Sequence, residues 1–327
     1  MSLYTENFRD RVLLAPIRNG ADKLMIISGY ATHTMASWHI TEIASQNLSP
    51  IEITLVVGMC VFDGISTAVH EGFKDIMSRN DTGNQSNLLC QYVYKGVPVH
   101  SKLYLWEKGG CPYCAYMGSA NYTQSAFSQM RRELLHECDP NEAFTYYETI
   151  EPYTIYCNHA EVEDDIKIVP THPILVAEES PLNSVRGSGV ESVTLSLLAR
   201  DGNTGRRSGL NWGQRSGREP NQAYIPLPID MVRKNFFPIL GNSSGRDNPH
   251  FSVLTDDGKQ LILRVEQQNN KAITTPMNNS LLGEYFRNRI DVGNGDYVTL
   301  QHLLNYGRTD VTFYKLDEEQ FFMDFSI

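Results

Sequence analysis

The sequence of 327 residues has few cysteines, no long apolar run and no overall excess of basic residues. Its six cysteines all lie in the first half and are too sparse for a small disulfide scaffold, so reduced thiols are expected. The longest apolar run, near 53–62, is about half of the ~20 residues that a membrane-spanning helix needs. The first ten residues carry acids and no apolar core, which argues against a secretory signal there. We therefore expect a soluble cytoplasmic protein with no membrane partner.

The net charge of −10 by itself argues against a nucleic acid partner, because phosphate-binding proteins usually carry a basic surface. The charge is unevenly distributed, however. Residues 1–180 contain 12 basic and 22 acidic side chains, whereas residues 181–327 contain 16 of each. The stretch 200–234 holds seven basic residues against three acids. This asymmetry indicates two parts with different functions.

The first half alternates apolar runs with helical periodicity. Runs at 24–29 and 53–59 predict buried strands, and the apolar spacing over 34–46 and 64–79 predicts helices. Shorter strands are predicted at 88–95, 101–108, 114–120 and 131–138, with a short helix at 125–130. This order predicts an α/β domain with a parallel or mixed sheet flanked by helices.

The second half is rich in strand candidates. A stretch with many Ser, Pro and Gly residues predicts a linker over 179–190, between domains at 1–178 and 191–327. Beyond it, strands are predicted at 193–199, 223–228, 250–256, 260–266, 296–300 and 311–316, and helices at 230–237 and 280–290. Short strands divided by loops are typical of a barrel or sandwich.

One group of residues in the first half has the side chains of a catalytic site. His100 and Lys102 lie in a predicted strand, where alternate residues share a face, and Gly118-Ser119-Ala120-Asn121 ends another. An imidazole beside an ammonium group suits a phosphodiester, because one attacks phosphorus and the other neutralises oxygen charge. Ser119 and Asn121 can add hydroxyl and amide donors, and a carboxylate behind the histidine would fix its tautomer.

These residues resemble the signature of the phospholipase D superfamily: His-x-Lys, four residues, Asp, then Gly-Ser-x-Asn. The sequence departs from it at Glu107, which stands in the Asp position, and by the insert KGGCPYC. The Asp is commonly lost in the nuclease branch, whose downstream glutamate Glu133 matches.

The resemblance implies roles for individual residues. His100 would form a phosphohistidine intermediate without any metal or other cofactor, and Lys102 and Asn121 would hold the phosphate. Ser119 would support them, and Glu133 would orient the histidine. Family active sites use two such motifs, and this chain has one. The resemblance therefore implies a homodimer with a composite active site on its two-fold axis.

Two polar loops in the second half are candidates for contact with DNA. Arginine reads guanine, Asn and Gln read adenine, and other basic groups anchor on phosphates. The alternative is that both are plain solvated loops. The candidates are Arg206, Arg207, Asn211, Trp212, Gln214, Arg215 and Arg218 in the first loop, and Gln267, Gln268, Asn269, Asn270 and Lys271 in the second.

The runs GLNWGQR, PNQAYIPLP and DYVTLQHLLNYGRTDVTFYKLDEEQFFMDF are similar to the B3-like pseudobarrel of the NgoFVII-type restriction endonucleases. These join a phospholipase-D-like nuclease to such a domain, as in the BfiI enzyme, and NgoAVII-like nuclease subunits are the nearest resemblance. It implies a sequence-specific, metal-independent restriction endonuclease acting on double-stranded DNA. Some relatives require an ATP-driven, helicase-like partner, and no Walker motif occurs here, so that ATPase would be a separate chain.

Other interpretations stay open at this point. A lipid-processing phosphodiesterase of the same superfamily would leave the second half unexplained, and a catalytically degenerate DNA-binding regulator would not need His100, Lys102 and Asn121. The Cys111-Pro-Tyr-Cys114 pair is spelled like a redox motif, and a zinc site with His136 and Cys138 is conceivable. Incidental thiols and no metal site are the expectation.

Overall fold

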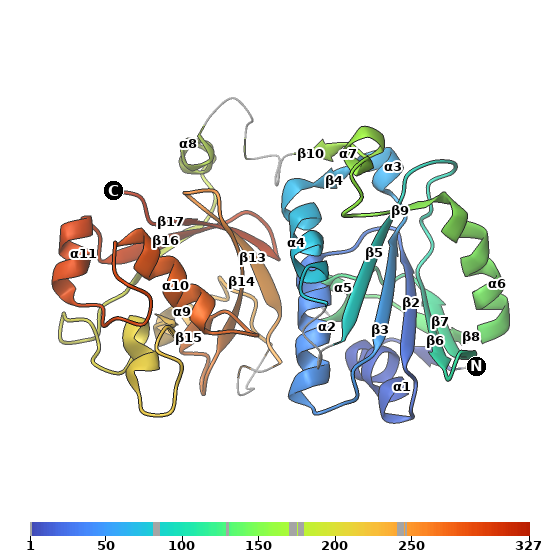
Figure 1. Ribbon diagram of the computed structural model, residues 1–327, viewed down its shortest axis with the longest axis horizontal. Coiled ribbons are helices and arrows are strands. Elements are labelled where there is room, and N and C mark those ends of the chain that lie inside the picture. Colours follow the sequence, from blue (N-terminus) through green and yellow to red (C-terminus); the bar gives the residue numbers. More distant parts are fainter. Residues whose placement is uncertain are drawn as a thin grey trace. The chain divides into compact units, whose positions relative to one another are not determined.

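The computed structural model describes residues 2–80, 86–128, 131–169, 175, 180–240, 245 and 247–327. The chain forms two compact units, Met1–Thr171 and His172–Ile327 (Figure 1). The predicted domain boundary at 178/179 lies outside the described residues. None of the helices in the described part of the chain is long and apolar enough to cross a membrane.

The first unit is built on an eight-stranded mixed sheet, as predicted. Neighbouring strands β2, β3 and β5 are parallel, and every other pair is antiparallel. The order across the sheet is β1 (Leu3–Tyr4), β8 (Leu135–Cys138), β7 (Cys111–Gly118), β6 (Leu103–Lys108), β2 (Lys23–Ser28), β3 (Glu52–Val57), β5 (Asn87–Val93) and β9 (Thr154–Tyr156).

The central strands are apolar throughout because helices cover both faces of the sheet. Leu24 and Ile26 face a core shared with α2 (His33–Ser45) and α4 (Thr67–Met77). Met25 and Ile27 face a second core on the side of α6 (Pro140–Ile150). Figure 1 shows these helices on the two sides of the sheet. The smaller elements are η1 (Arg9–Leu14), α1 (Ala15–Arg18), α3 (Cys60–Asp63), α5 (Gln124–Phe127), η2 (Glu151–Tyr153), α7 (Val162–Asp165) and the pair β4 (Ile65–Ser66) and β10 (Ile168–Val169).

The second unit is a nearly closed barrel of seven strands, as the β-rich pattern predicted. Only β13 and β17 pair in parallel. Phe237, Phe251 and Phe321 pack together at the centre of its core. The strand order is β11 (Ser192–Ser196), β16 (Asp310–Lys315), β17 (Gln320–Asp324), β13 (His250–Thr255), β14 (Gln260–Glu266), β15 (Ala272–Thr274) and β12 (Ile225–Pro226). Its helices are α8 (Pro181–Gly187), η3 (Gly209–Gln214), α9 (Ile229–Arg233), α10 (Ser280–Arg289) and α11 (Leu300–Tyr306).

Two predictions for this half are corrected. The strand at 296–300 is absent, because Thr299 accepts a hydrogen bond from the His302 backbone N–H and so starts α11 at Leu300. Residues of the predicted linker form α8 (Pro181–Gly187), where Val185 packs with Phe322 and others in an apolar cluster. Capping and packing outweighed the loop-like composition of both stretches.

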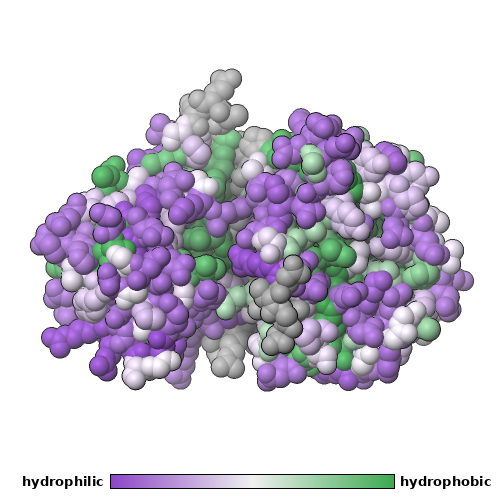
Figure 2. All heavy atoms as spheres, in the orientation of Figure 1, coloured by the Kyte–Doolittle hydropathy of each residue, from purple (hydrophilic) through white to green (hydrophobic). Residues whose placement is uncertain are grey.

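Hydrophilic residues cover most of the face of each unit that Figure 2 shows, with small apolar patches between them. Around the carboxyl edge of the first sheet several large apolar side chains are nevertheless exposed. Val97 is 84% exposed and Phe62 is 75% exposed. This edge is where the motif residues gather.

Candidate active site

The motif residues meet at the carboxyl ends of the parallel strands, the usual position for a binding site in such sheets. Gly58 follows β3, and its carbonyl accepts a hydrogen bond from the Val99 backbone N–H at 3.0 Å. This bond ties the segment before His100 to the edge of the sheet. His100 itself is exposed.

His100 and Lys102 precede β6 and are not part of a strand, so that detail of the sequence analysis is wrong. The side chains converge all the same. The Lys102 Nζ lies 3.1 Å from Nδ1 and 3.2 Å from Nε2 of His100, and 2.6 Å from its carbonyl oxygen. Lys102 is only 7% exposed. Burial lowers the pKa of its ammonium group, and the nearby Glu133 carboxylate counteracts part of that effect.

Asn121 is held so that its amide NH2 is the free end. The Asn121 Oδ1 accepts hydrogen bonds from the Ser28 hydroxyl at 3.3 Å and from the Tyr30 backbone N–H at 3.2 Å. The Ser28 hydroxyl also accepts from the Tyr122 backbone N–H at 2.9 Å. Because the oxygen is occupied, the amide donors are left to bind an anion.

Ser119 and Glu133 form a pair beside this group. The Ser119 hydroxyl donates to the Glu133 carboxylate and accepts from the Leu134 backbone N–H at 3.1 Å. Within one chain, the carboxylate of Glu133 therefore bonds to Ser119. Its predicted role in orienting His100 stays a prediction.

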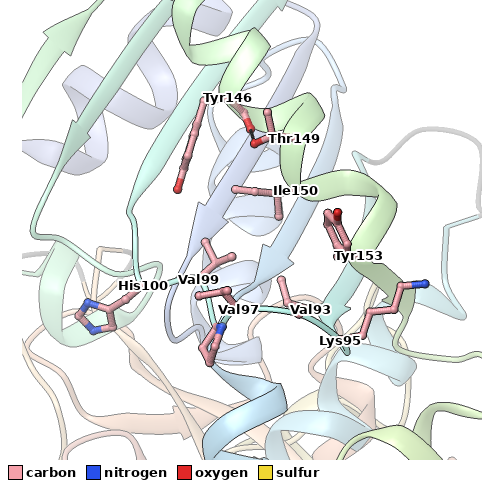
Figure 3. A pocket seen from close by; sticks show the side chains of 11 residues that line it. Val93, Lys95, Val97, Val99, His100, Tyr146, Thr149, Ile150 and Tyr153 are labelled. Carbon is pink, nitrogen blue, oxygen red and sulfur yellow. Dashed lines mark hydrogen bonds between the residues drawn. The ribbon is translucent and has the colours of Figure 1, made fainter.

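A cavity of about 440 Å³ borders His100 on the side of α6. Its apolar lining includes Val99, Ile150 and Tyr153 (Figure 3). The Tyr146 hydroxyl lies 2.9 Å from that of Ser101, which ties α6 to the stretch between His100 and Lys102. In Figure 3 the imidazole stands at one end of the lining and points away from α6. The cavity thus flanks the motif segment.

Glu107, which stands in the Asp position of the signature, does not reach the motif. It is buried and forms an ion pair with Lys23 at 3.4 Å. It lies five positions after Lys102 along nearly extended chain, roughly 16 Å at about 3.3 Å per residue. Glu107 is therefore too far from Lys102 to contact a phosphate bound there, and it forms its ion pair within the sheet.

The cysteine pair shows no sign of a redox or metal site. Cys111 and Cys114 both lie in β7 with free thiols, whereas redox-active pairs with the pattern Cys-x-x-Cys lie at the start of a helix. Within the described ranges, no group of three or more His, Cys, Asp or Glu side chains is arranged to hold a metal ion.

The first predicted DNA-binding loop mixes exposed and structural residues. Asn211 is fully buried, and its amide bonds to the carbonyl oxygens of Gly205 and Val298 and to the Val298 N–H. The prediction that Asn211 contacts DNA is therefore wrong, because it has no surface to offer. The Gln214 amide similarly donates to the Gly295 carbonyl at 2.9 Å, although its side chain is partly exposed.

Four arginines of this loop are exposed: Arg206, Arg207, Arg215 and Arg218. The Arg218 guanidinium lies over the Trp212 ring at 4.0 Å, and Trp212 meets Tyr224 edge to face at 5.7 Å. The half-buried indole thus anchors the loop and carries a cation on its face. These groups remain available to phosphates or base edges.

The second loop is a tight turn between β14 and β15. Gln267, Asn269 and Asn270 have positive φ angles of 70°, 64° and 55°. Asn270 is buried and accepts a hydrogen bond from Asn248 at 2.8 Å, so the prediction that it reads a base is wrong. Gln268, Asn269 and Lys271 are exposed, and Gln267 is half-buried.

The two loops flank β15. Pro226 pairs with Ala272 and Ile225 with Ile273, so the chain entering β12 meets the far end of β15 from the turn at 267–271. β15 has only three residues, roughly 7 Å from first to last. The turn at 267–271 therefore lies at one end of this short strand, and the segment that leads from the first loop into β12 lies at the other.

Comparison with known families agrees with this architecture. Residues 6–164 match the NgoFVII restriction endonuclease N-terminal PLD domain, and residues 185–317 match the NgoFVII C-terminal B3-like DNA-binding domain. The chain belongs to the NgoFVII restriction endonuclease family. The two matched domains of this family correspond in order and extent to the two compact units.

Among solved structures, two similar chains are NucT from Helicobacter pylori and polyphosphate kinase from Porphyromonas gingivalis. NucT is 15% identical over 47% of this chain and 97% of its own, with a TM-score of 0.31. The kinase is 13% identical over 52% of this chain and 26% of its own, also with a TM-score of 0.31. Likenesses this distant add nothing to the family assignment. No curated protein sequence matches the chain.

Sequence reasoning missed Ser28 and Tyr30, which orient Asn121, and Gly58, which positions Val99. Only one weak signal points to them. Ser28 and Gly29 end one apolar run, and Gly58 ends the next. Small residues at the ends of adjacent parallel strands indicate a close approach of backbone to the site.

Proposed function

We propose that this protein is a sequence-specific, metal-independent endonuclease that hydrolyses DNA phosphodiesters through a phosphohistidine on His100. Family membership supports a DNA nuclease of the phospholipase D type. The observation that carries the proposal is the convergence of an exposed imidazole, a buried ammonium group and an oriented amide at one strand edge. Together these supply a nucleophile and two phosphate ligands.

The chemistry would proceed in two displacements. One imidazole nitrogen of His100 forms a bond to phosphorus while the bond from phosphorus to the leaving oxygen breaks, and that oxygen takes a proton from the partner's His100. Water then attacks phosphorus and gives its proton to the partner's His100, and the N–P bond breaks. Lys102 and the amide of Asn121 stabilise charge on the non-bridging oxygens, with Ser119 in support. The proposed orienting role of Glu133 is tested by Glu133→Gln.

The second histidine of this scheme has to come from another copy of the chain, because the motif occurs once. We therefore include a symmetric homodimer with one composite site in the proposal. Sedimentation of the purified protein alone and with DNA tests it. An active monomer would refute the shared site.

The barrel would supply sequence recognition on double-stranded DNA. The exposed Arg206, Arg207, Arg215 and Arg218 suit phosphates and guanine edges, with Trp212 as their support. From the turn, Gln267, Gln268, Asn269 and Lys271 supply amide and ammonium donors. In this scheme Asn211, Gln214 and Asn270 hold the loops in shape.

Plasmid cleavage with and without EDTA is the direct test. Cleavage should persist in EDTA, should vanish in His100→Ala, and should be retained by His159→Ala, which removes another exposed histidine of the same unit. DNA binding by His100→Ala should equal that of the parent. A strict metal requirement, or cleavage by His100→Ala, would contradict the proposal.

An ATP-dependent, helicase-like subunit is the remaining part of the proposal, as the family resemblance implies. Cleavage by the purified chain is compared with cleavage after adding proteins that co-purify with it, with and without ATP. Stimulation that needs ATP supports such a partner. Equal rates in all arms would contradict it.

A further inference from the structure

We propose that Tyr30, anchored by Asp63, is a positioning residue that holds the nucleophilic imidazole of His100 in its reactive orientation. The inference rests on the proposed function of His100. Neither Tyr30 nor Asp63 belongs to the motif. Tyr30 lies two residues after the end of β2, and Asp63 is the last residue of α3.

Tyr30 is fixed at both its backbone and its hydroxyl. Its backbone N–H donates to Asn121 Oδ1 at 3.2 Å, and its carbonyl accepts from the Ser28 hydroxyl at 2.5 Å. The Tyr30 hydroxyl donates to Asp63 Oδ2 at 2.6 Å. A side chain that is 43% exposed would otherwise sample several rotamers. The bond to Asp63 selects one.

In that rotamer the phenol ring stands against the imidazole. The ring centroids of Tyr30 and His100 are 6.0 Å apart, with planes at 80°, which is the preferred edge-to-face arrangement. The backbone of Gly29 lies close as well, since a Cβ there would be 3.1 Å from His100 Cδ2. Lys102 is the third neighbour, at both ring nitrogens. Tyr30, Gly29 and Lys102 together restrict the rotation of an exposed nucleophile.

The hydroxyl of Tyr30 acts on His100 only through the ring. It is bonded to Asp63, and this hydrogen bond is the main reason that the pKa of Tyr30 is raised, with burial adding to it. Tyr30 also joins two functional groups, because the same residue orients the amide of Asn121 through its backbone. A loosened Tyr30 side chain would free the imidazole while leaving that backbone contact in place.

The test separates the anchor from the ring. Tyr30→Phe keeps the ring and removes its hydroxyl, and Asp63→Ala removes the acceptor from an exposed position without burying anything new. Each should lower the single-turnover cleavage rate on the order of five- to tenfold, with the Kd for DNA unchanged. The double variant should be no slower than either single one. Asp63→Asn keeps an acceptor oxygen and should restore the parent rate, and Tyr113→Phe serves as the control for an exposed tyrosine elsewhere in the unit.

A second readout does not need nuclease activity. Modification of His100 by diethyl pyrocarbonate, followed by peptide mass spectrometry, should accelerate severalfold in Tyr30→Phe and Asp63→Ala, and not in Asp63→Asn. Unchanged modification in both loosened variants, or rate losses that add in the double variant, would overturn the inference. If the parent protein cleaves no DNA, the proposed function fails, and the modification pattern still decides the role of Tyr30.

Discussion

Replacing Gly58 by alanine should displace the nucleophile without touching it. An added Cβ would lie 1.9 Å from the Val99 carbonyl oxygen and 2.8 Å from the Val99 Cβ. To reach 3.0 Å, the shortest separation found in folded proteins, the Val99 backbone has to move by at least about 1.1 Å. Val99 directly precedes His100, so the imidazole moves with it.

The magnitude follows from this displacement. A misplacement of about 1 Å costs on the order of 100-fold in rate. The clash should cost about 1–3 kcal/mol of unfolding free energy, and the loss of the Val99–Gly58 hydrogen bond about 1 kcal/mol more. At roughly 2–4 °C per kcal/mol for a unit of this size, the melting temperature should fall by about 5–15 °C.

Single-turnover cleavage and thermal melting of three variants check the reasoning. Gly187→Ala adds a Cβ that meets nothing within 4 Å and should match the parent in both assays. In Gly29→Ala the one tight contact of the added Cβ is His100 Cδ2 at 3.1 Å, whereas His100 Cα and Met59 Cγ lie at 3.5 Å, an ordinary van der Waals distance. This variant should therefore slow cleavage with little change in stability. Gly58→Ala should be worst in both. If it cleaves within threefold of the parent at an unchanged melting temperature, the steric argument is wrong.

Three further predictions concern both units. Asn211→Ala should destabilise the barrel by about 2–4 kcal/mol in urea unfolding, because it leaves buried backbone groups unpaired, whereas Gln268→Ala should leave stability unchanged. Arg207→Ala should weaken DNA binding and reduce the slope of log Kd against log salt by about one if Arg207 contacts a phosphate; an unchanged slope would exclude that contact. Burial lowers the pKa of His33 and of His39 to about 4, with a backbone hydrogen bond partly opposing this at His39. As the pH falls, the histidines of the unfolded chain take up protons near pH 6.5, whereas those of the folded chain do so only near pH 4. The free energy of unfolding is therefore highest above pH 6.5 and decreases toward pH 4. The expected decrease between pH 7 and 5 is roughly 2 kcal/mol per histidine. A flat urea-unfolding free energy over that range would refute the assignment.

The sequence was most informative where local pattern decides the outcome. The apolar runs at 24–29 and 53–59 are the central parallel strands, because a strand covered on both faces has to be apolar throughout. His100 and Lys102 could be paired because they are two residues apart. The prediction that they lie in a strand was wrong, but the predicted proximity of their side chains was right, since the two meet in an irregular segment.

Other features depend on contacts between distant segments. Ser28 lies 93 residues from the Asn121 amide that it helps to orient, and no local pattern marks that distance. Composition could not tell which amides of a polar loop turn inward, so Asn211 and Asn270 were assigned to DNA although both are buried. The helix α6 was missed although Asp139 caps its start and Pro140 follows, a signature that was present in the sequence.

If the turn between β14 and β15 contacts DNA as proposed, its backbone limits which positions can change the recognised sequence. Gln267, Asn269 and Asn270 occupy left-handed backbone conformations, which mostly Asn, Asp and Gly tolerate without strain. Substitution at these three positions would strain the turn itself, and the side chain of Asn270 is buried. Gln268 and Lys271 are exposed and do not have positive φ angles, so replacing their side chains does not strain the backbone of the turn. New specificities in this turn should therefore arise at 268 and 271, and a two-position library there would retain the fold.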